Sequence, residues 1–259
     1  MKNDELTGVF DSGVGGLSIL KELIPYGGHY LYFGDTKNLP YGNKTKDEII
    51  NFTRDIIKFF INKGAKKVIM ACNTSSALAY ETLNLEFGHK IKIYPLIQTV
   101  APYIAKESDV IGVMATEGTV KSQTYTKEIK KVNSDIKVYE LACPDFVKIV
   151  ENGLYNEKES VDYIKEHLDI LLNKGCKKIV LGCTHYPYLL PILTKWADEK
   201  TFINPALYMT NLVKNNFYNG SSKVEFFVSS SPEKFRKNAS IFMEIKEGVE
   251  LVENKICKV

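Results

Sequence analysis

Two cysteines occupy matching positions in two similar parts of the chain, and each follows a short apolar run. Segments 62–72 and 173–183 align without gaps at a constant offset of 111 positions (183 minus 72), and they end on Cys72 and Cys183. A thiol has an unperturbed pKa of roughly 8.5, so it can act as a base when ionised and as an acid when protonated. Two thiols on opposite sides of one carbon could therefore remove a proton from one face and return one to the other, which is the chemistry of a racemase.

Other cysteine chemistries fit the surrounding sequence less well. A cysteine phosphatase would need a C-x5-R pattern, but Leu78 and Leu189 stand where the arginines would be. His185, close to Cys183, keeps a cysteine hydrolase open, although such an enzyme would need only one nucleophile. Cys183 and His185 alone supply too few ligands for zinc, so no metal site is expected.

A glycine-rich segment, Asp11–Gly16, follows the first apolar run and precedes a helical pattern. It departs from the dinucleotide-binding G-x-G-x-x-G fingerprint because Ser18 stands at the third glycine position. Backbone N–H groups at such a turn could instead bind a small anion such as a carboxylate. Asp11 and Asp35 each follow an apolar run, and they are candidates either for helix capping or for orienting an ammonium or a thiol.

The apolar pattern along the chain predicts strands that alternate with amphipathic helices, which is typical of α/β folds with parallel sheets. Strands are expected near 6–10, 30–33, 68–71, 110–114 and 179–181, and helices from about 17, over 46–62 and over 161–173. Because the second half repeats the first, we expect two pseudo-symmetric parallel-sheet α/β domains that arose by internal duplication. Ligands of such sheets bind at the carboxyl ends of the strands, so halves that face each other would place the two thiols across a shared cleft. The tail, with a helical stretch near 204–217 and a strand near 224–228, could return to either half.

Composition and charge argue against several other classes of protein. The 259 residues carry 34 Lys and Arg against 31 Asp and Glu, a formal charge of +3, with Arg54 and Arg236 as the only arginines. This balance does not favour nucleic acid as a partner. No run of about 18 apolar residues predicts a membrane helix, and the charged start lacks signal-peptide features, so a cytoplasmic protein is expected. Five cysteines at irregular spacings, without a C-x2-C pair, indicate free thiols rather than disulfides or a zinc ribbon.

Four motifs stand in order along the chain: VFDSGVGGL at 9–17, FGDT at 33–36 with PYG at 40–42, ACNT at 71–74, and LGCTHYP at 181–187. Together they resemble the glutamate racemases of the cofactor-independent aspartate/glutamate racemase superfamily. The resemblance implies that glutamate is the substrate, that no cofactor takes part, and that the product D-glutamate is used for peptidoglycan. An aspartate or broad-specificity amino-acid racemase is the alternative.

The same resemblance implies how the chain is divided. Residues 1–97 would form the first α/β domain, with 208–259 returning to it, and residues 98–207 would form the second. The active site would lie in the cleft between the two domains. The implied partner is the small-molecule substrate, without nucleic acid or membrane, and a homodimer is left open.

Residue roles carried over from the family fall on the matching motifs. Cys72 and Cys183 would be the catalytic thiols, with Asp11 assisting Cys72, and His185 and Glu151 assisting Cys183. The substrate contacts would be Asp11, Ser12, Tyr41, Gly42, Asn73, Thr74, Thr184 and His185, and the weaker candidates for the pocket are Asp35, Thr116 and Thr119. Because both arginines lie away from these motifs, we expect backbone N–H groups and threonine hydroxyls to bind the side-chain carboxylate of the substrate.

Overall fold

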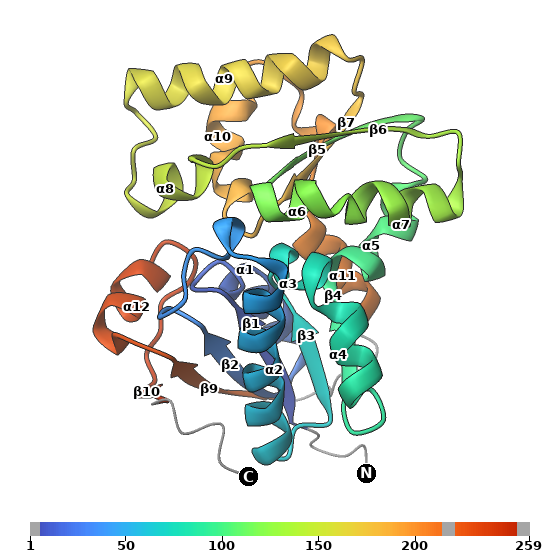
Figure 1. The fold of residues 1–259 in the computed structure, drawn as a ribbon. Coiled ribbons are helices and arrows are strands. Elements are labelled where there is room, and N and C mark those ends of the chain that lie inside the picture. Colours follow the sequence, from blue (N-terminus) through green and yellow to red (C-terminus); the bar gives the residue numbers. More distant parts are fainter. Residues whose placement is uncertain (1–5, 214–220, 253–259) are drawn as a thin grey trace.

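Two parallel β-sheets, each covered by helices, make up the molecule (Figure 1). The computed structural model describes residues 6–213 and 221–252. The first sheet has the strand order β10-β9-β2-β1-β3-β4, and the second has the order β6-β5-β7-β8. The strands of the first sheet are β1 Thr7–Asp11, β2 Gly28–Gly34, β3 Lys67–Met70, β4 Lys92–Pro95, β9 Ser222–Val228 and β10 Val249–Leu251. Those of the second are β5 Val110–Ala115, β6 Lys137–Ala142, β7 Lys178–Gly182 and β8 Phe202–Ile203.

The strand order confirms the predicted duplication. The order β2-β1-β3-β4 in the first sheet recurs as β6-β5-β7-β8 in the second, and the pairings among these strands are parallel in both. Strands β3 and β7 therefore hold equivalent places, each next to the central strand of its sheet. Cys72 and Cys183, which follow these two strands, lie at equivalent positions of the two sheets.

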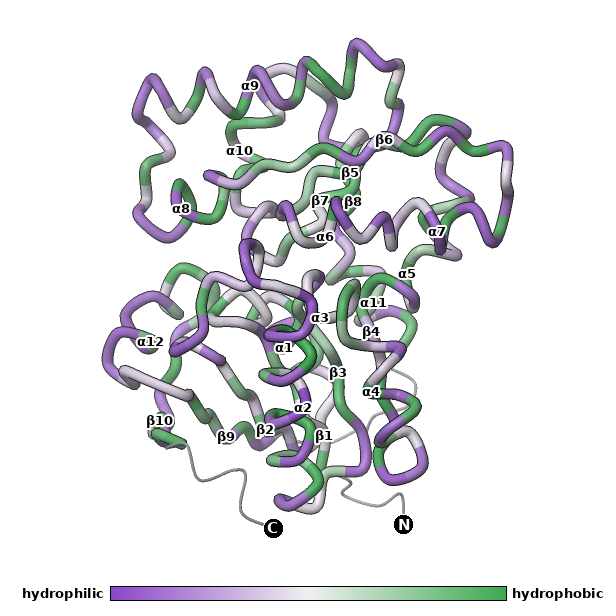
Figure 2. The backbone as a smooth tube through the Cα atoms, in the orientation of Figure 1, coloured by the Kyte–Doolittle hydropathy of each residue, from purple (hydrophilic) through white to green (hydrophobic). Residues whose placement is uncertain are grey.

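Helices fill the connections between the parallel strands, as crossovers of this kind require. In the first half they are α1 Leu17–Leu23, α2 Lys46–Asn62, α3 Asn73–Leu78, α4 Tyr80–Phe87 and α5 Leu96–Ile104. The remaining helices are α6 Glu117–Ser122, α7 Thr124–Val132, α8 Phe146–Glu151, α9 Lys158–Asn173, α10 Leu190–Leu193, α11 Pro205–Val213 and α12 Pro232–Ala239. Figure 2 shows hydrophilic and hydrophobic residues alternating along α9, which is the pattern of a helix with one face on the core.

Local sequence signals explain where the two long helices begin and end. Helix α2 spans the predicted residues 46–62, and a capping box formed by Thr45 and Glu48 satisfies its first N–H groups. Its end is followed by Gly64 in the left-handed region at φ 85°, and α9 is followed likewise by Gly175 at φ 77°. Helix α9 begins at Lys158 rather than at the predicted 161, because its first turn is polar and the apolar pattern starts only after it.

The tail of the chain returns to the first sheet. Strand β9 pairs with β2 over its whole length, and β10 pairs with β9 at the outer edge. The helix predicted over 204–217 is seen as α11, and residues 214–220 lie outside the described part of the chain. The predicted domain boundaries fall within α5 and α11, two helices that pack against each other, and they stay a prediction.

The central strands carry the core. All five residues of β1 are buried, as expected for a parallel strand with helices on both faces. Within residues 6–213 and 221–252, none of the helices has the length and apolar content that a bilayer crossing would need. The four cysteines in these ranges are free and buried, whereas Cys257 lies outside them.

Candidate active site

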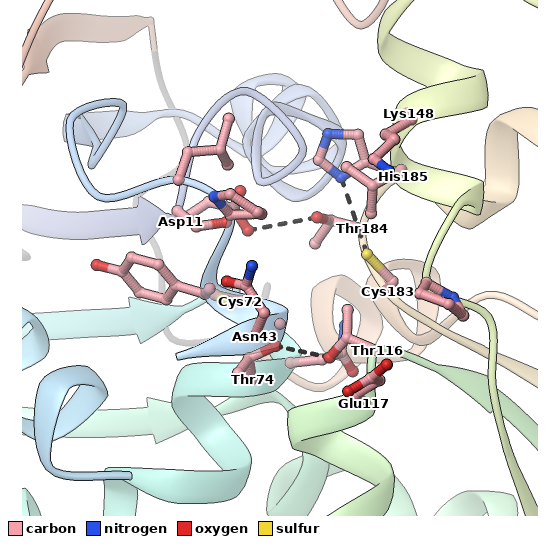
Figure 3. A pocket seen from close by; sticks show the side chains of 18 of the residues that line it. Asp11, Asn43, Cys72, Thr74, Thr116, Glu117, Lys148, Cys183, Thr184 and His185 are labelled. Carbon is pink, nitrogen blue, oxygen red and sulfur yellow. Dashed lines mark hydrogen bonds between the residues drawn. The ribbon is translucent and has the colours of Figure 1, made fainter. Parts of the chain in front are cut away.

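A cavity of about 420 Å³ lies between the two sheets, where the carboxyl ends of their strands face each other (Figure 3). This is the edge at which parallel α/β sheets bind ligands. Twelve of the predicted site residues line it: Asp11, Ser12, Tyr41, Gly42, Cys72, Asn73, Thr74, Thr116, Glu151, Cys183, Thr184 and His185. Among the described residues, those lining the cavity do not include the other two candidates, Asp35 and Thr119.

The thiol of Cys72 lies on one side of the cavity, between the end of β3 and the start of α3. Cys72 is only 5% exposed. Burial, together with the negative charge of Asp11, raises the pKa of the Cys72 thiol to about 12, against a smaller opposite effect of hydrogen bonds from Ser75. Cys72 is therefore a protonated thiol at neutral pH, which suits a proton donor.

The thiol of Cys183 belongs to a chain of three functional groups. Its Sγ lies 3.8 Å from His185 Nδ1, and His185 Nε2 lies 3.1 Å from Glu151 Oε1. Burial disfavours the charged imidazole, but the hydrogen bonds to Cys183 and Glu151 and the negative charge of Asp11 outweigh it and raise the pKa of His185 to about 10. A protonated His185 can donate one hydrogen bond to the carboxylate of Glu151 and the other to the sulfur of Cys183. The sulfur of Cys183 therefore faces a charged hydrogen-bond donor.

Asp11 connects the two halves of the site. At the end of β1, its carboxylate accepts hydrogen bonds from the Gly13 N–H at 3.0 Å and from the Thr184 hydroxyl at 3.3 Å. Burial raises the pKa of Asp11, while the charge of His185 and these hydrogen bonds act in the opposite direction. Asp11 is close enough to Cys72 for its charge to raise the pKa of that thiol. Its influence on Cys72 is therefore electrostatic in this structure.

Three threonine hydroxyls connect the segment after β3 with the segment after β5. Thr74 lies 3.0 Å from Thr116, and Thr119 lies 3.1 Å from Thr116 and 3.4 Å from Thr74, measured between Oγ1 atoms. Thr74 and Thr116 face the cavity, whereas Thr119 is fully buried behind them. Thr119 thus supports the wall of the cavity without forming part of it.

Asp35 also lies behind the cavity rather than in its wall. It is buried, and its carboxylate accepts hydrogen bonds from the Tyr41 hydroxyl at 2.5 Å and the Ser229 hydroxyl at 2.6 Å. The side chain of Asn38 donates to both of its oxygens. Asp35 therefore holds Tyr41, which does line the cavity, and ties it to the segment after β9.

Sequence reasoning missed part of the wall. The additional lining residues are Leu39, Pro40, Asn43, Glu117, Pro144, Asp145, Val147 and Lys148. Val147 and Lys148 stand four and three positions before Glu151 on α8, so they share a helix face with it. Counting back from Glu151 at helical spacing would have found them. Lys148 is a cation in the wall, and it forms an exposed ion pair with Asp145 at 3.0 Å.

In the described residues, no group of three or more His, Cys, Asp or Glu side chains has an arrangement that could hold a metal ion. The side chains at this site that can transfer a proton include two thiols, the imidazole of His185 paired with Glu151, and the carboxylate of Asp11. Hydroxyls and backbone N–H groups can bind anionic parts of a ligand beside them.

Known proteins of similar sequence and fold indicate the family to which this chain belongs. The model of the Asp/Glu/Hydantoin racemase family matches residues 21–210. Glutamate racemase 2 from Caldanaerobacter subterraneus subsp. tengcongensis is 38% identical over 250 residues, which cover 91% of this chain and 92% of the relative. The crystal structure of the glutamate racemase from Francisella tularensis subsp. tularensis in complex with D-glutamate superposes with a TM-score of 0.88 at 32% identity, covering 96% of this chain and 97% of the other. The chain therefore belongs to the Asp/Glu/hydantoin racemase family and is an isomerase.

Proposed function

We propose that the protein interconverts L- and D-glutamate by proton transfer at Cα between the thiols of Cys72 and Cys183, without a cofactor. The observation that carries this proposal is that two buried thiols, at equivalent positions of the two sheets, line the same cavity. The relatives named as glutamate racemases, and the bound D-glutamate in one of them, support glutamate as the substrate. The D-glutamate formed would supply peptidoglycan synthesis.

From the resemblance to the glutamate racemases, we propose that Cys183 is the base for L-glutamate and Cys72 the base for D-glutamate. The Cys183 thiolate, beside a protonated His185, takes the proton from Cα, and the electron pair of the broken bond remains on the substrate as a carbanion. The Cys72 thiol then gives its proton to the opposite face of that carbon and becomes a thiolate. For D-glutamate the two thiols exchange roles. The high pKa of Cys72 supports its role as a proton donor.

Binding of the substrate carboxylates falls to groups other than arginine. Arg54 pairs with Glu86 on the outside of α2, and Arg236 donates to backbone carbonyls near the end of the chain. We propose that backbone N–H groups around Tyr41, Gly42 and Thr184, with the hydroxyls of Thr74 and Thr184, bind the side-chain carboxylate of the substrate. Buried donors placed for one distance between carboxylates would be left unpaired by a shorter substrate, at a cost of roughly 1–3 kcal/mol each.

We propose that residues 1–97 with 208–259 form one domain and residues 98–207 the other. The paths of β9 and β10 along the first sheet support the return of the tail. We also propose that the protein is cytoplasmic. Both a monomer and a homodimer are left open.

Pure L-glutamate and pure L-aspartate, each incubated with the protein and no added cofactor, test this function. We expect the optical rotation of the glutamate solution to fall to zero as an equal mixture forms, and aspartate to react far more slowly. Comparable rates for both would support a broad-specificity racemase instead. Unchanged L-glutamate would contradict the proposal.

The rate is expected to depend on pH as a bell-shaped curve, because one thiol must be ionised while the other is protonated. We expect the alkaline side of kcat/KM to fall near pH 10, since His185, with its pKa raised to about 10, is protonated below that pH and loses its charge above it. Cys72, with a pKa of about 12, keeps its proton to higher pH. The two enantiomers have equal free energies, so kcat/KM must be the same from either side at every pH.

The variant His185→Asn identifies the group responsible for the alkaline fall. It should lower kcat/KM throughout and remove the fall near pH 10, since the titrating imidazole is gone. An alkaline limb at the same pH in both proteins would show that His185 does not control it.

A further inference from the structure

A fully buried tyrosine connects the residues next to the two thiols. Tyr125 belongs to α7, beside the second sheet, and its hydroxyl donates a hydrogen bond to Asn73 Oδ1 at 2.8 Å. Its ring lies so close to Gly182 that a Cβ on this glycine would be 3.2 Å from Cε2 of the tyrosine. Asn73 directly follows Cys72, and Gly182 directly precedes Cys183. One side chain therefore contacts both thiol-bearing segments.

We infer that Tyr125 is a positioning residue, which fixes the amide of Asn73 so that its NH₂ group faces the cavity and donates to a carboxylate of the substrate. This inference rests on the proposed function. Asn73 is 3% exposed and lines the cavity, so its side chain has one partner behind it and open space in front. A carboxylate can only accept hydrogen bonds, so the amide must present nitrogen rather than oxygen.

The hydroxyl of Tyr125 supplies the preference between the two amide orientations. An amide offers an oxygen and an NH₂ group of similar shape, and the partner behind it decides which of them points outward. Burial raises the pKa of Tyr125 well above its usual value, with smaller contributions from the charges of Glu140 and Cys183. The hydroxyl therefore stays protonated and remains a donor to Oδ1 over the whole working pH range.

Substitution of Tyr125 by phenylalanine isolates the hydroxyl. The ring and its contact with Gly182 remain, so the fold and the segment before Cys183 keep their packing. Asn73 loses its fixed partner, and its oxygen can then turn toward the substrate carboxylate. We expect KM to rise about tenfold for both L- and D-glutamate, as for the loss of one buried hydrogen bond. We expect kcat to change less than about threefold.

A double-mutant cycle distinguishes positioning from a purely structural role. Asn73→Ala removes the group through which Tyr125 is inferred to act. In the Asn73→Ala background, the change Tyr125→Phe should alter KM by less than about twofold, because no amide is left to orient. A structural effect of the lost hydroxyl would persist in that background.

Tyr30→Phe is the matched control. Tyr30 is also fully buried, and its hydroxyl donates to the Gly27 carbonyl oxygen at 2.8 Å, at the start of β2. It should change the melting temperature about as much as Tyr125→Phe does and leave KM unchanged. The same samples, titrated calorimetrically with D-glutamate, should repeat the order of affinities without turnover.

The results of these experiments distinguish the role of Tyr125 from the proposed function on which it rests. If the unmodified protein racemises glutamate but Tyr125→Phe leaves KM unchanged, or raises it equally with and without Asn73, the inference is wrong and the proposed function stands. If the unmodified protein neither racemises nor binds glutamate, both are overturned. A raised KM that disappears in the Asn73→Ala background supports the inference.

Discussion

Replacing either Cys72 or Cys183 with alanine is expected to lower kcat for glutamate racemisation by roughly 10³-fold or more, with the fold intact. A positioned acid or base contributes about 10²–10⁴ in rate, and here each thiol is needed in every turnover, once as a base and once as an acid. Both side chains are small and face the cavity, so their loss removes little packing. Steady-state rates and circular dichroism of the two variants are the measurements.

Cys176→Ala provides the matched control for the thiol variants. Cys176 is 4% exposed, lies before β7 and is absent from the cavity wall that the described residues form. Its replacement should cost about 0.5–3 kcal/mol of stability through lost packing and leave kcat within about twofold. Cys143→Ala should behave similarly, since Cys143 is buried too and is absent from the cavity wall that the described residues form. A Cys72→Ala or Cys183→Ala protein that keeps most of its activity would contradict the two-thiol mechanism.

A single methyl group at Gly15 is expected to lower kcat/KM by at least about 100-fold, although Gly15 carries no functional group. A Cβ at this position would overlap Thr184 Oγ1 and would lie 2.8 Å from Thr184 Cβ and 2.9 Å from His185 Cε1. The loop after β1 and the segment after Cys183 would have to separate. That movement would break the Asp11–Thr184 hydrogen bond and displace His185 from Cys183.

Gly248→Ala is the control for this prediction. A Cβ at Gly248 would meet no atom of the described residues within 4 Å. The activity and melting temperature of Gly248→Ala should therefore match those of the unmodified protein. Gly15→Ala should bind glutamate weakly and turn it over slowly while its far-ultraviolet circular dichroism stays unchanged. Full activity of Gly15→Ala would show that the close approach of the two halves at this point is not needed for catalysis.

The repeat in the sequence was enough to predict most of the fold. Segments 62–72 and 173–183 each contain the end of a helix, a glycine stop and a buried strand, and these signals are local. Such signals act between residues close in sequence and do not depend on how the rest of the chain is arranged. This explains why α2 begins and ends where predicted. The equivalence of β3 and β7 followed from the same pattern, and with it the matched positions of the two thiols.

Features that depend on long-range contacts could not be predicted in this way. The tail could have joined either half, and only the pairing of β9 with β2 decides between them. Asp35 and Thr119 have the same residue types as groups that face the cavity, but their side chains bond to Tyr41 and to Thr116 behind its surface. The direction in which such a side chain points depends on the neighbouring elements, which the residue type does not specify.

Hydrogen exchange at Cα of glutamate in heavy water shows whether a separate thiol serves each face of the substrate. If Cys183 takes the proton of L-glutamate and Cys72 delivers one from the other side, the D-glutamate formed first should carry deuterium at Cα. The L-glutamate that remains should stay protiated during the early turnovers. A hydrolase would leave the Cα hydrogen untouched.

Nuclear magnetic resonance of the separated enantiomers, at a few per cent conversion, gives the label in each. The two-thiol mechanism predicts nearly complete deuteration of the product and almost none in the remaining substrate, in both directions of the reaction. A single base that serves both faces would return some of the original proton to the product and introduce deuterium early into the starting enantiomer. Equal early label in both enantiomers would therefore contradict the assignment of one thiol to each face, even if racemisation itself is observed.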